Sequence, residues 1–286
     1  MKRVIRIKAY AKINLFLDVK GKRDDGYHDI VSIMQSIDLY DIVTVKKKSS
    51  GGIKIICNNP SVPDDHNNIA YKCADLFFKT QGIASGSVEI TIDKRIPVAG
   101  GLAGGSTDGA SVLKALNILY DQNLDMTELC TIGSKIGADI PYCLKGGTCL
   151  CEGIGDILTP FESDLKSYIF VLAEIPASVS TKEAYEIIDK NNIKENSICV
   201  DEIINCLKEG NLRPNLLYNV FEKIEEQNIP QITSVKNVLD SFDALKSMMS
   251  GSGPTVFGIF SNLKNAASAC SDLKDKGINA YICRSI

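Results

Sequence analysis

The sequence has no apolar run near the ~18 residues that a membrane-spanning helix needs, so no transmembrane segment is expected. We expect no signal peptide either, because Arg6, Lys8 and Lys12 interrupt the apolar residues near the N-terminus. The formal net charge is only −3, which gives no electrostatic case for binding nucleic acid. These absences predict a cytoplasmic protein with no membrane or nucleic-acid partner.

A zinc-binding pattern is missing as well. The chain has 10 cysteines, but only Cys149 and Cys151 form a tight pair, and neither a second pair nor a histidine accompanies them. The cysteines are scattered through apolar strand and helix patterns, so we expect buried free thiols rather than disulfides.

What is present is ordinary globular composition, with 44% hydrophobic and 23% charged residues in 286. The chain is long enough for one large domain or two of ordinary size. Alternating and helical spacings predict the order of the elements. The expected strands lie within residues 3–57, 87–93, 168–175, 254–260 and 278–286, and the expected helices within 66–80, 106–120, 126–136, 181–190, 215–240 and 263–276.

The element order predicts an α+β protein of two lobes with the ligand site in the cleft between them. Residues 137–158 are expected to form loop and strand, and Pro160 suits a boundary. We therefore place an N-terminal lobe at residues 1–160 and a C-terminal lobe at 161–286.

A glycine-rich stretch, PVAGGLAGGST at residues 97–107, runs from a strand pattern into a helix pattern. Free backbone N–H groups and the positive end of a helix dipole meet there, an arrangement that suits phosphate. The Walker pattern fails because Ser106 stands where lysine is required, and the dinucleotide pattern fails at Leu102. A purely structural glycine turn remains the alternative.

Three other stretches carry polar groups that a simple core element would not need. In AYAKINLFL, Lys12 and Asn14 share one face of a strand pattern, which a solvent-facing side would also explain. In GADIPYC, Asp139 precedes a proline at a turn-like position and could be a simple turn aspartate. A second glycine loop, SGSGPTVFG, leads into a strand and could be only a tight turn.

Taken in order, AKINLFL, PVAGGLAGGST, GADIPY and SGSGPT resemble the motifs of the GHMP small-molecule kinases, such as galactokinase, homoserine kinase and mevalonate kinase. AKINLFLDVKGKRDDGYHDI is most similar to the branch of that family that phosphorylates a cytidine diphosphate polyol in non-mevalonate isoprenoid precursor biosynthesis. The resemblance runs from about residue 8 to residue 260. It departs from the usual pattern at Tyr10, Ala103 and Thr107, where the family commonly has proline, glycine and serine.

The resemblance implies an ATP-dependent kinase with ATP as co-substrate. Asp139 would take the proton from the attacking hydroxyl, and Lys12, close to it, would stabilise the developing alkoxide. The phosphates of ATP would bind along the whole glycine loop: Pro97, Val98, Ala99, Gly100, Gly101, Leu102, Ala103, Gly104, Gly105, Ser106 and Thr107.

The same resemblance implies a substrate site at Asn14, Tyr27, His28, Thr181 and Tyr185. The aromatic rings would stack on the cytosine base, and Asn14 and Thr181 would meet the polyol or the diphosphate. Tyr185 could instead be a helix core residue. Mg²⁺ should accompany ATP, but no pair of acidic residues identifies its ligands.

Two alternatives remain at this level. One is another GHMP kinase with a smaller alcohol, of the homoserine, mevalonate or sugar type. The other is a non-catalytic nucleotide-binding regulator, against which the presence of both Lys12 and Asp139 argues. His66, in DDHNN, has no matching role and is expected in a surface loop. The sequence leaves the oligomeric state open.

Overall fold

The chain forms two compact units in the computed structural model, which describes residues 3–84, 86–177, 179–191 and 196–286. Unit 1 comprises the residues up to Ala11 together with Leu39–Val98 and Ala103–Gly146. Unit 2 comprises Lys12–Asp38, Ala99–Leu102 and Gly147–Ile286. Each unit consists of three separate segments of the chain, so no single boundary divides the two units. The boundary near residue 160, which separates two binding roles, stays a prediction.

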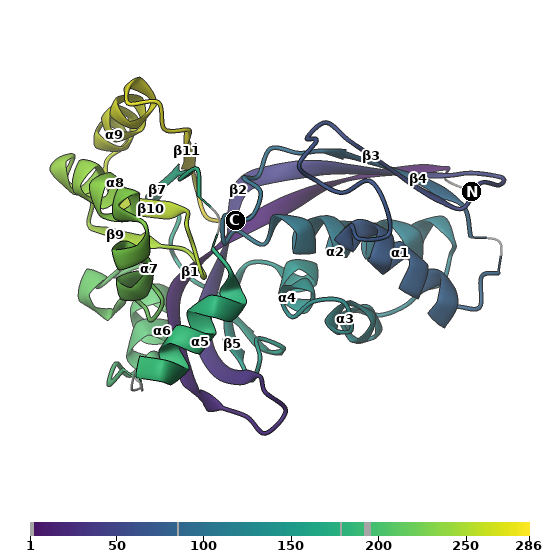
Figure 1. The fold of residues 1–286 in the computed structure, drawn as a ribbon, viewed down its shortest axis with the longest axis horizontal. Coiled ribbons are helices and arrows are strands. Elements are labelled where there is room, and N and C mark those ends of the chain that lie inside the picture. The colour runs from purple at the N-terminus through teal and green to yellow at the C-terminus, as the bar shows by residue number, and fades with distance from the viewer. Residues whose placement is uncertain (1–2, 85, 178, 192–195) are drawn as a thin grey trace. The chain divides into compact units, whose positions relative to one another are not determined.

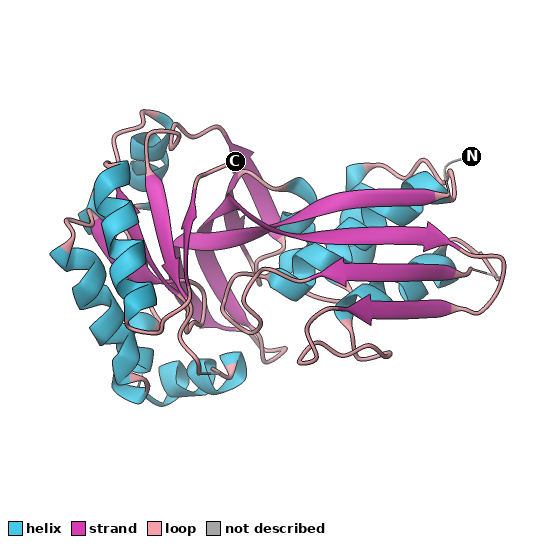
Figure 2. Ribbon diagram, turned by 90° about the horizontal axis from the view of Figure 1, so that it is seen from above, coloured by secondary structure: helices cyan, strands magenta, loops and turns pink. Residues whose placement is uncertain are grey.

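Unit 1 is a sheet with helices on one face. Its strands are the first part of β1 (Val4–Lys22), the second part of β2 (His28–Lys47), β3 (Ile53–Cys57) and β4 (Val88–Asp93), in the order β3-β4-β2-β1. The helices are α1 (Ile69–Thr80), α2 (Gly104–Leu119), α3 (Met126–Ser134) and α4 (Asp139–Lys145). Figures 1 and 2 show all four against the same face, and the apolar core of this unit lies between the two layers.

Local sequence explains where the helices of unit 1 begin. The Asn68 side chain accepts the Ala70 N–H before α1, and Asp125 forms a capping box with Glu128 at the start of α3. Helix α2 has no such cap. It follows Ala103, whose φ of 56° is left-handed, and therefore begins directly from the glycine loop.

Unit 2 contains a four-stranded antiparallel sheet with its own core. Its strands are β7 (Ile169–Ala173), β9 (Lys246–Met249), β10 (Val256–Phe260) and β11 (Ala280–Cys283), in the order β11-β7-β10-β9. Helices α8 (Pro230–Ser241) and α9 (Leu263–Asp275) pack on it. The remaining helices are α5 (Thr181–Asn191), α6 (Val200–Lys208), the 3₁₀ turn Pro214–Leu216 and α7 (Glu222–Asn228).

Three short strands complete unit 2. Strands β5 (Thr148–Glu152) and β6 (Ile157–Phe161) form a hairpin whose first strand pairs with β2, and β8 (Tyr218–Asn219) pairs in parallel with β1. The parallel pairing joins Phe16 to Tyr218 and Leu17 to Asn219. It places Asn219 a few residues along β1 from Lys12.

The α+β class and most predicted elements are confirmed, but one detail was wrong. Residues 139–145 form a helix rather than a loop, and Pro141 fits there because it lies in the first helical turn, where no backbone N–H is needed. Pro160 lies inside β6, which among the described residues pairs with β5 alone and so tolerates a missing N–H. The prediction also missed α6 and β9. No helix in the described ranges is long and apolar enough to cross a membrane.

Candidate active site

Lys12 and Asn14 are buried in β1, with exposed fractions of 4% and 1%, so the solvent-facing alternative is wrong. The Lys12 ammonium donates to Asn14 Oδ1 at 2.7 Å. Asn14 Nδ2 in turn donates to Ser32 Oγ at 2.8 Å, and Ser32 Oγ donates to the Phe16 carbonyl at 2.7 Å. Both polar atoms of Asn14 are thus engaged, and this chain of hydrogen bonds orients Lys12.

The segment Ala99–Leu102 of the glycine loop is fixed within unit 2. The Lys12 N–H donates to the Leu102 carbonyl at 3.2 Å, and Ser250 Oγ donates to the Gly101 carbonyl at 3.1 Å. Gly101 has a φ of +74°, and a Cβ there would lie 2.2 Å from the Ser250 carbonyl oxygen. Glycine is required at 101 for both its left-handed backbone and this close approach of the second glycine loop.

The second glycine loop also reaches Lys12. Gly251 has a φ of +59°, and a Cβ there would lie 3.3 Å from Lys12 Nζ and 3.4 Å from Asn14 Oδ1. Asn219 Nδ2 holds this loop by donating to the carbonyls of Met249 and Gly251, each at 2.8 Å. Sequence reasoning did not single out Asn219, because an isolated asparagine forms no motif and its partners lie about thirty residues away.

Beyond Leu102 the loop continues in unit 1, where a buried charged cluster underlies the start of α2. Lys94 Nζ lies 2.5 Å from Asp41 Oδ2 and 2.8 Å from Asp108 Oδ2. Asp41 Oδ1 also accepts the backbone N–H groups of Arg95 and Ile96. A Cβ at Gly104 would lie 2.9 Å from Lys94 Nζ, so the ammonium lies directly against the first residue of α2.

Burial dominates the electrostatics of this cluster. It raises the pKa of Asp108 to about 7, with Asp41 adding to the rise and Lys94 opposing it. Asp108 Oδ1 has no hydrogen-bond partner among the described residues. For Lys94, burial lowers the pKa but the Asp108 and Asp41 charges outweigh it, and the net pKa is raised. The cluster connects β4 to the helix that follows the glycine loop.

Asp139 is the first residue of α4 in unit 1. Its neighbours Ile140 and Tyr142 are buried at 0% and 1% exposure, and the Ile140 N–H donates to the Gly137 carbonyl, so the backbone at Asp139 is well anchored. Lys12 belongs to unit 2. The pairing of Lys12 with Asp139 stays a prediction.

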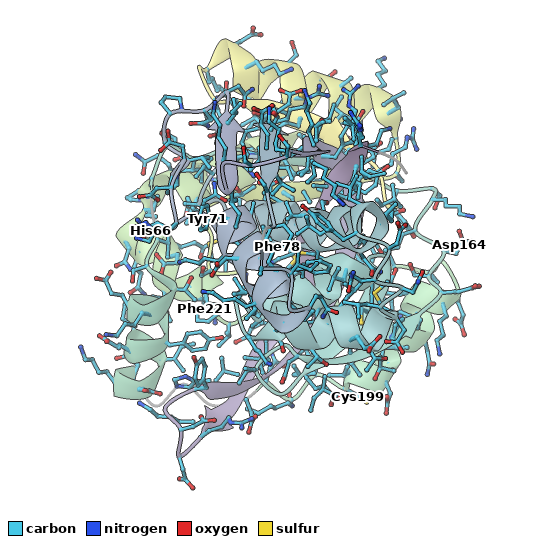
Figure 3. The ribbon with its side chains drawn as sticks, turned by 90° about the vertical axis from the view of Figure 1, so that its right-hand side faces the viewer. His66, Tyr71, Phe78, Asp164, Cys199 and Phe221 are labelled. Carbon is cyan, nitrogen blue, oxygen red and sulfur yellow. The ribbon has the colours of Figure 1, made fainter. Side chains whose placement is uncertain are left out.

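The predicted base-binding residues form an aromatic cluster in unit 2. The rings of His28 and Tyr185 stack with centroids 4.6 Å apart. The rings of Tyr185 and Phe221, which is labelled in Figure 3, lie at 89° to each other with centroids 5.0 Å apart. Tyr185 also packs against the core of the unit, so its part in ligand binding stays a prediction. Tyr27, which precedes His28 in the chain, is 61% exposed.

Thr181, the first residue of α5, lies next to the second glycine loop. Its Oγ1 is 2.8 Å from Ser252 Oγ. The hydroxyl is therefore positioned by the same loop that approaches Lys12 and Asn14. The Ser250–Gly253 segment thus approaches four of the predicted site residues: Lys12, predicted for catalysis, Asn14 and Thr181, predicted for the substrate, and Gly101, predicted for ATP.

These site residues are not accompanied, within the described ranges, by a cluster of metal-binding side chains. The described ranges contain no group of three histidine, cysteine or acidic side chains that could hold a metal ion. Cys149 and Cys151 are buried in β5. His66, whose side chain is 77% exposed, lies in the loop before α1 at the edge of the view in Figure 3, which confirms the surface-loop prediction.

Comparison with known proteins identifies relatives over nearly the whole chain. Residues 68–147 match the GHMP kinases N terminal domain, and residues 200–279 match the GHMP kinases C terminal domain. The chain is 46% identical to a 4-diphosphocytidyl-2-C-methyl-D-erythritol kinase of Clostridium botulinum, covering 98% of this chain and 99% of the relative. It is 45% identical to a protein of the same name from Caldicellulosiruptor saccharolyticus, covering 94% and 92%.

Solved structures give the same result. A crystal structure of 4-(cytidine 5'-diphospho)-2C-methyl-D-erythritol kinase is similar with a TM-score of 0.83 and 29% identity, covering 98% of this chain and 99% of that one. The L. major mevalonate kinase in complex with R-mevalonate has a TM-score of 0.77 at 15% identity and shares the fold.

Proposed function

The chain belongs to the GHMP kinase family, and we propose that it transfers the γ-phosphoryl group of ATP to the 2-hydroxyl of 4-diphosphocytidyl-2-C-methyl-D-erythritol. This is a step in non-mevalonate isoprenoid precursor biosynthesis. The observation that carries the substrate assignment is the 46% identity, over 98% of this chain, to a relative of that name. The aromatic cluster of His28 and Tyr185 supports it, because a homoserine, mevalonate or sugar kinase needs no stacking surface for a base.

In this reaction Asp139 accepts the proton of the attacking 2-hydroxyl, which makes the oxygen a better nucleophile. Lys12 stabilises the negative charge that develops on this oxygen. The burial of Lys12 supports the role, since a charge in a low-dielectric environment acts more strongly than one in water. Asn14 orients the ammonium through its 2.7 Å hydrogen bond, so little reorganisation is needed during the transfer.

The glycine loop at residues 97–107 binds the phosphates of ATP through backbone N–H groups and the N-terminus of α2. Phosphoryl transfer depends mostly on positioning and charge stabilisation, so a loop without the Walker lysine suffices when Lys12 is present. Mg²⁺ usually binds one or two carboxylates together with substrate phosphates and water. The described residues offer no dedicated acidic cluster for it, and we assign it no protein ligand. The substrate base and polyol bind at Asn14, Tyr27, His28, Thr181 and Tyr185.

The test is ADP release with a panel of alcohols: the cytidine diphosphate polyol, homoserine, mevalonate and galactose, each with ATP and Mg²⁺. We expect turnover with the first alone, and ³¹P NMR of the product should place the new phosphate on the 2-hydroxyl. Faster turnover of a smaller alcohol would identify a different GHMP kinase. ATP binding without turnover of any alcohol would favour the nucleotide-binding regulator.

A further inference from the structure

His28 makes a hydrogen bond that neither the sequence motifs nor the proposed chemistry account for. Its Nε2 lies 2.7 Å from Oδ1 of Asp189, in helix α5, and the other carboxylate oxygen of Asp189 lies 2.6 Å from Lys22 Nζ. The three residues come from β1, β2 and α5, all within unit 2. The Lys22 hydrogen bond and then the His28 hydrogen bond lower the pKa of Asp189, so this carboxyl is ionised.

An ionised carboxylate only accepts hydrogen bonds, so Nε2 of His28 must carry the hydrogen of this pair. In the neutral imidazole the other nitrogen, Nδ1, then bears a lone pair and is an acceptor. Nδ1 has no hydrogen-bond partner among the described residues. Lys22 balances the charge of Asp189, so the three groups together carry no net charge when the imidazole is neutral.

The aromatic cluster fixes the plane of the His28 imidazole, and the lone pair of Nδ1 lies in that plane. The imidazole and the Tyr185 ring lie only 16° from parallel, and Tyr185 is itself held by an edge contact with Phe221. A base that forms an in-plane hydrogen bond with Nδ1 is therefore nearly parallel to the Tyr185 ring as well. Such a base would extend the existing stack, and the exposed ring of Tyr27 lies next to His28 in the chain.

Cytosine and uracil differ at the edge that such a contact would reach. Cytosine carries an exocyclic amino group, a donor, where uracil carries a carbonyl oxygen, an acceptor. We propose that Asp189 is a positioning residue that holds His28 as the Nε2–H tautomer, so that Nδ1 accepts the cytosine amino group and rejects uracil, a role that rests on the proposed function. The carboxylate touches no substrate atom and acts only through the imidazole.

The test compares kcat/KM for the cytidine substrate and for the same molecule with uracil in place of cytosine. The wild type should prefer the cytidine substrate by about 10- to 100-fold. In Asp189→Asn, Lys22 should hold the amide oxygen, and the amide nitrogen should donate to Nε2, which reverses the tautomer. This variant should lose or invert the preference while the KM for ATP is unchanged. Asp189→Glu keeps the carboxylate and should retain the preference.

Glu186→Gln is the matched control, because Glu186 is exposed on the same helix and its substitution removes a like charge. It should leave the ratio unchanged. An Asp189→Asn enzyme that keeps the wild-type ratio overturns the role of Asp189. If the variant turns over neither substrate, calorimetric binding of CDP and UDP gives the same ratio.

The tautomer can be read without any turnover. The chain has only 2 histidines, and His66→Gln identifies the second set of imidazole signals. At pH 8, ¹⁵N spectra should show the His28 hydrogen on Nε2 in the wild type and not in Asp189→Asn. A wild-type hydrogen on Nδ1 contradicts the inference. A wild type with the expected tautomer but no turnover of the cytidine substrate would instead contradict the proposed function.

Discussion

Unit 1 buries the ammonium of Lys94 and unit 2 buries that of Lys12, and the two groups are compensated in different ways. Lys94, with a 4% exposed side chain, contacts the carboxylates of Asp41 and Asp108. Lys12 is equally buried, and within unit 2 its ammonium donates a hydrogen bond to the neutral amide of Asn14. A buried charge is costly unless a counter-charge compensates it. Lys94 has such counter-charges within its own unit, which indicates a role in folding, whereas the role of Lys12 toward a negative group on a substrate stays a prediction.

Replacing Lys12 should give the largest effect on activity. Lys12→Met keeps the chain length and removes the charge, so kcat should fall by ~10²–10⁴-fold while the melting temperature stays close to wild type. Asp139→Asn should cause a similar fall with substrate affinity largely kept, because it removes only the basicity of the carboxylate. Steady-state kinetics and thermal melting of both variants check this.

The double variant tests whether Lys12 and Asp139 act on the same hydroxyl. Groups that act as a unit are grossly non-additive, so the double variant should be little worse than either single one. Two losses that multiply would show that the residues act independently. Wild-type kcat in either single variant would remove that residue from the mechanism.

Replacing Lys94 should lower the stability of the protein. Lys94→Met leaves two buried carboxyls without their cation, and the free energy of unfolding should fall by about 3–5 kcal/mol. Lys79→Met is the control, because the Lys79 side chain is 70% exposed and its ion pair with Asp75 contributes little. Urea denaturation measures both. Equal stability losses would mean that the Lys94 cluster is no more important than a surface pair.

The Asp108 carboxyl should make the stability of the protein depend on pH. Its folded-state pKa of about 7 lies above the ordinary aspartate value of 3.8, so between these values the folded protein retains a proton that the unfolded chain has released. The stability from this group is complete below the unfolded pKa and is lost as the pH rises through about 7. The slope can reach about 1.4 kcal/mol per pH unit.

The Asp108→Asn substitution removes the titrating carboxyl. Between pH 5 and pH 8 the wild type should therefore lose about 1–3 kcal/mol more stability than the variant. Urea denaturation at several pH values gives both curves, and Asp24→Asn, at an exposed turn residue, should parallel the wild type. Parallel curves for Asp108→Asn and the wild type would show that Asp108 is ionised throughout.

The two lysines also show how far the sequence can be used. Lys12 could be singled out because it lies in a motif, AKINLFL, whose alternation predicts a strand. Lys94 could not, because its partners Asp41 and Asp108 lie 53 and 14 residues away and only the fold brings them together. The same holds for Asn219 and Asp189, each of which acts through a tertiary contact. Sequence reasoning missed the helix at 139–145 because an aspartate shortly before a proline is typical of a turn, although the first turn of a helix accepts proline.

The smallest expected effect on stability concerns two left-handed alanines of the glycine loop. Ala99 and Ala103 both have a φ of 56°, a left-handed conformation that costs an alanine about 1–2 kcal/mol. Ala103→Gly should relieve this strain and raise the free energy of unfolding by about 0.5–1 kcal/mol, after the larger unfolded-state entropy of glycine is subtracted. Ala99→Gly should behave alike.

Ala267→Gly, at an exposed position inside α9, should instead destabilise by about 1 kcal/mol, because its backbone is right-handed and gains nothing from glycine. Chemical denaturation of the three variants measures the difference in sign. If Ala103→Gly destabilises as much as Ala267→Gly, the left-handed alanines carry no strain.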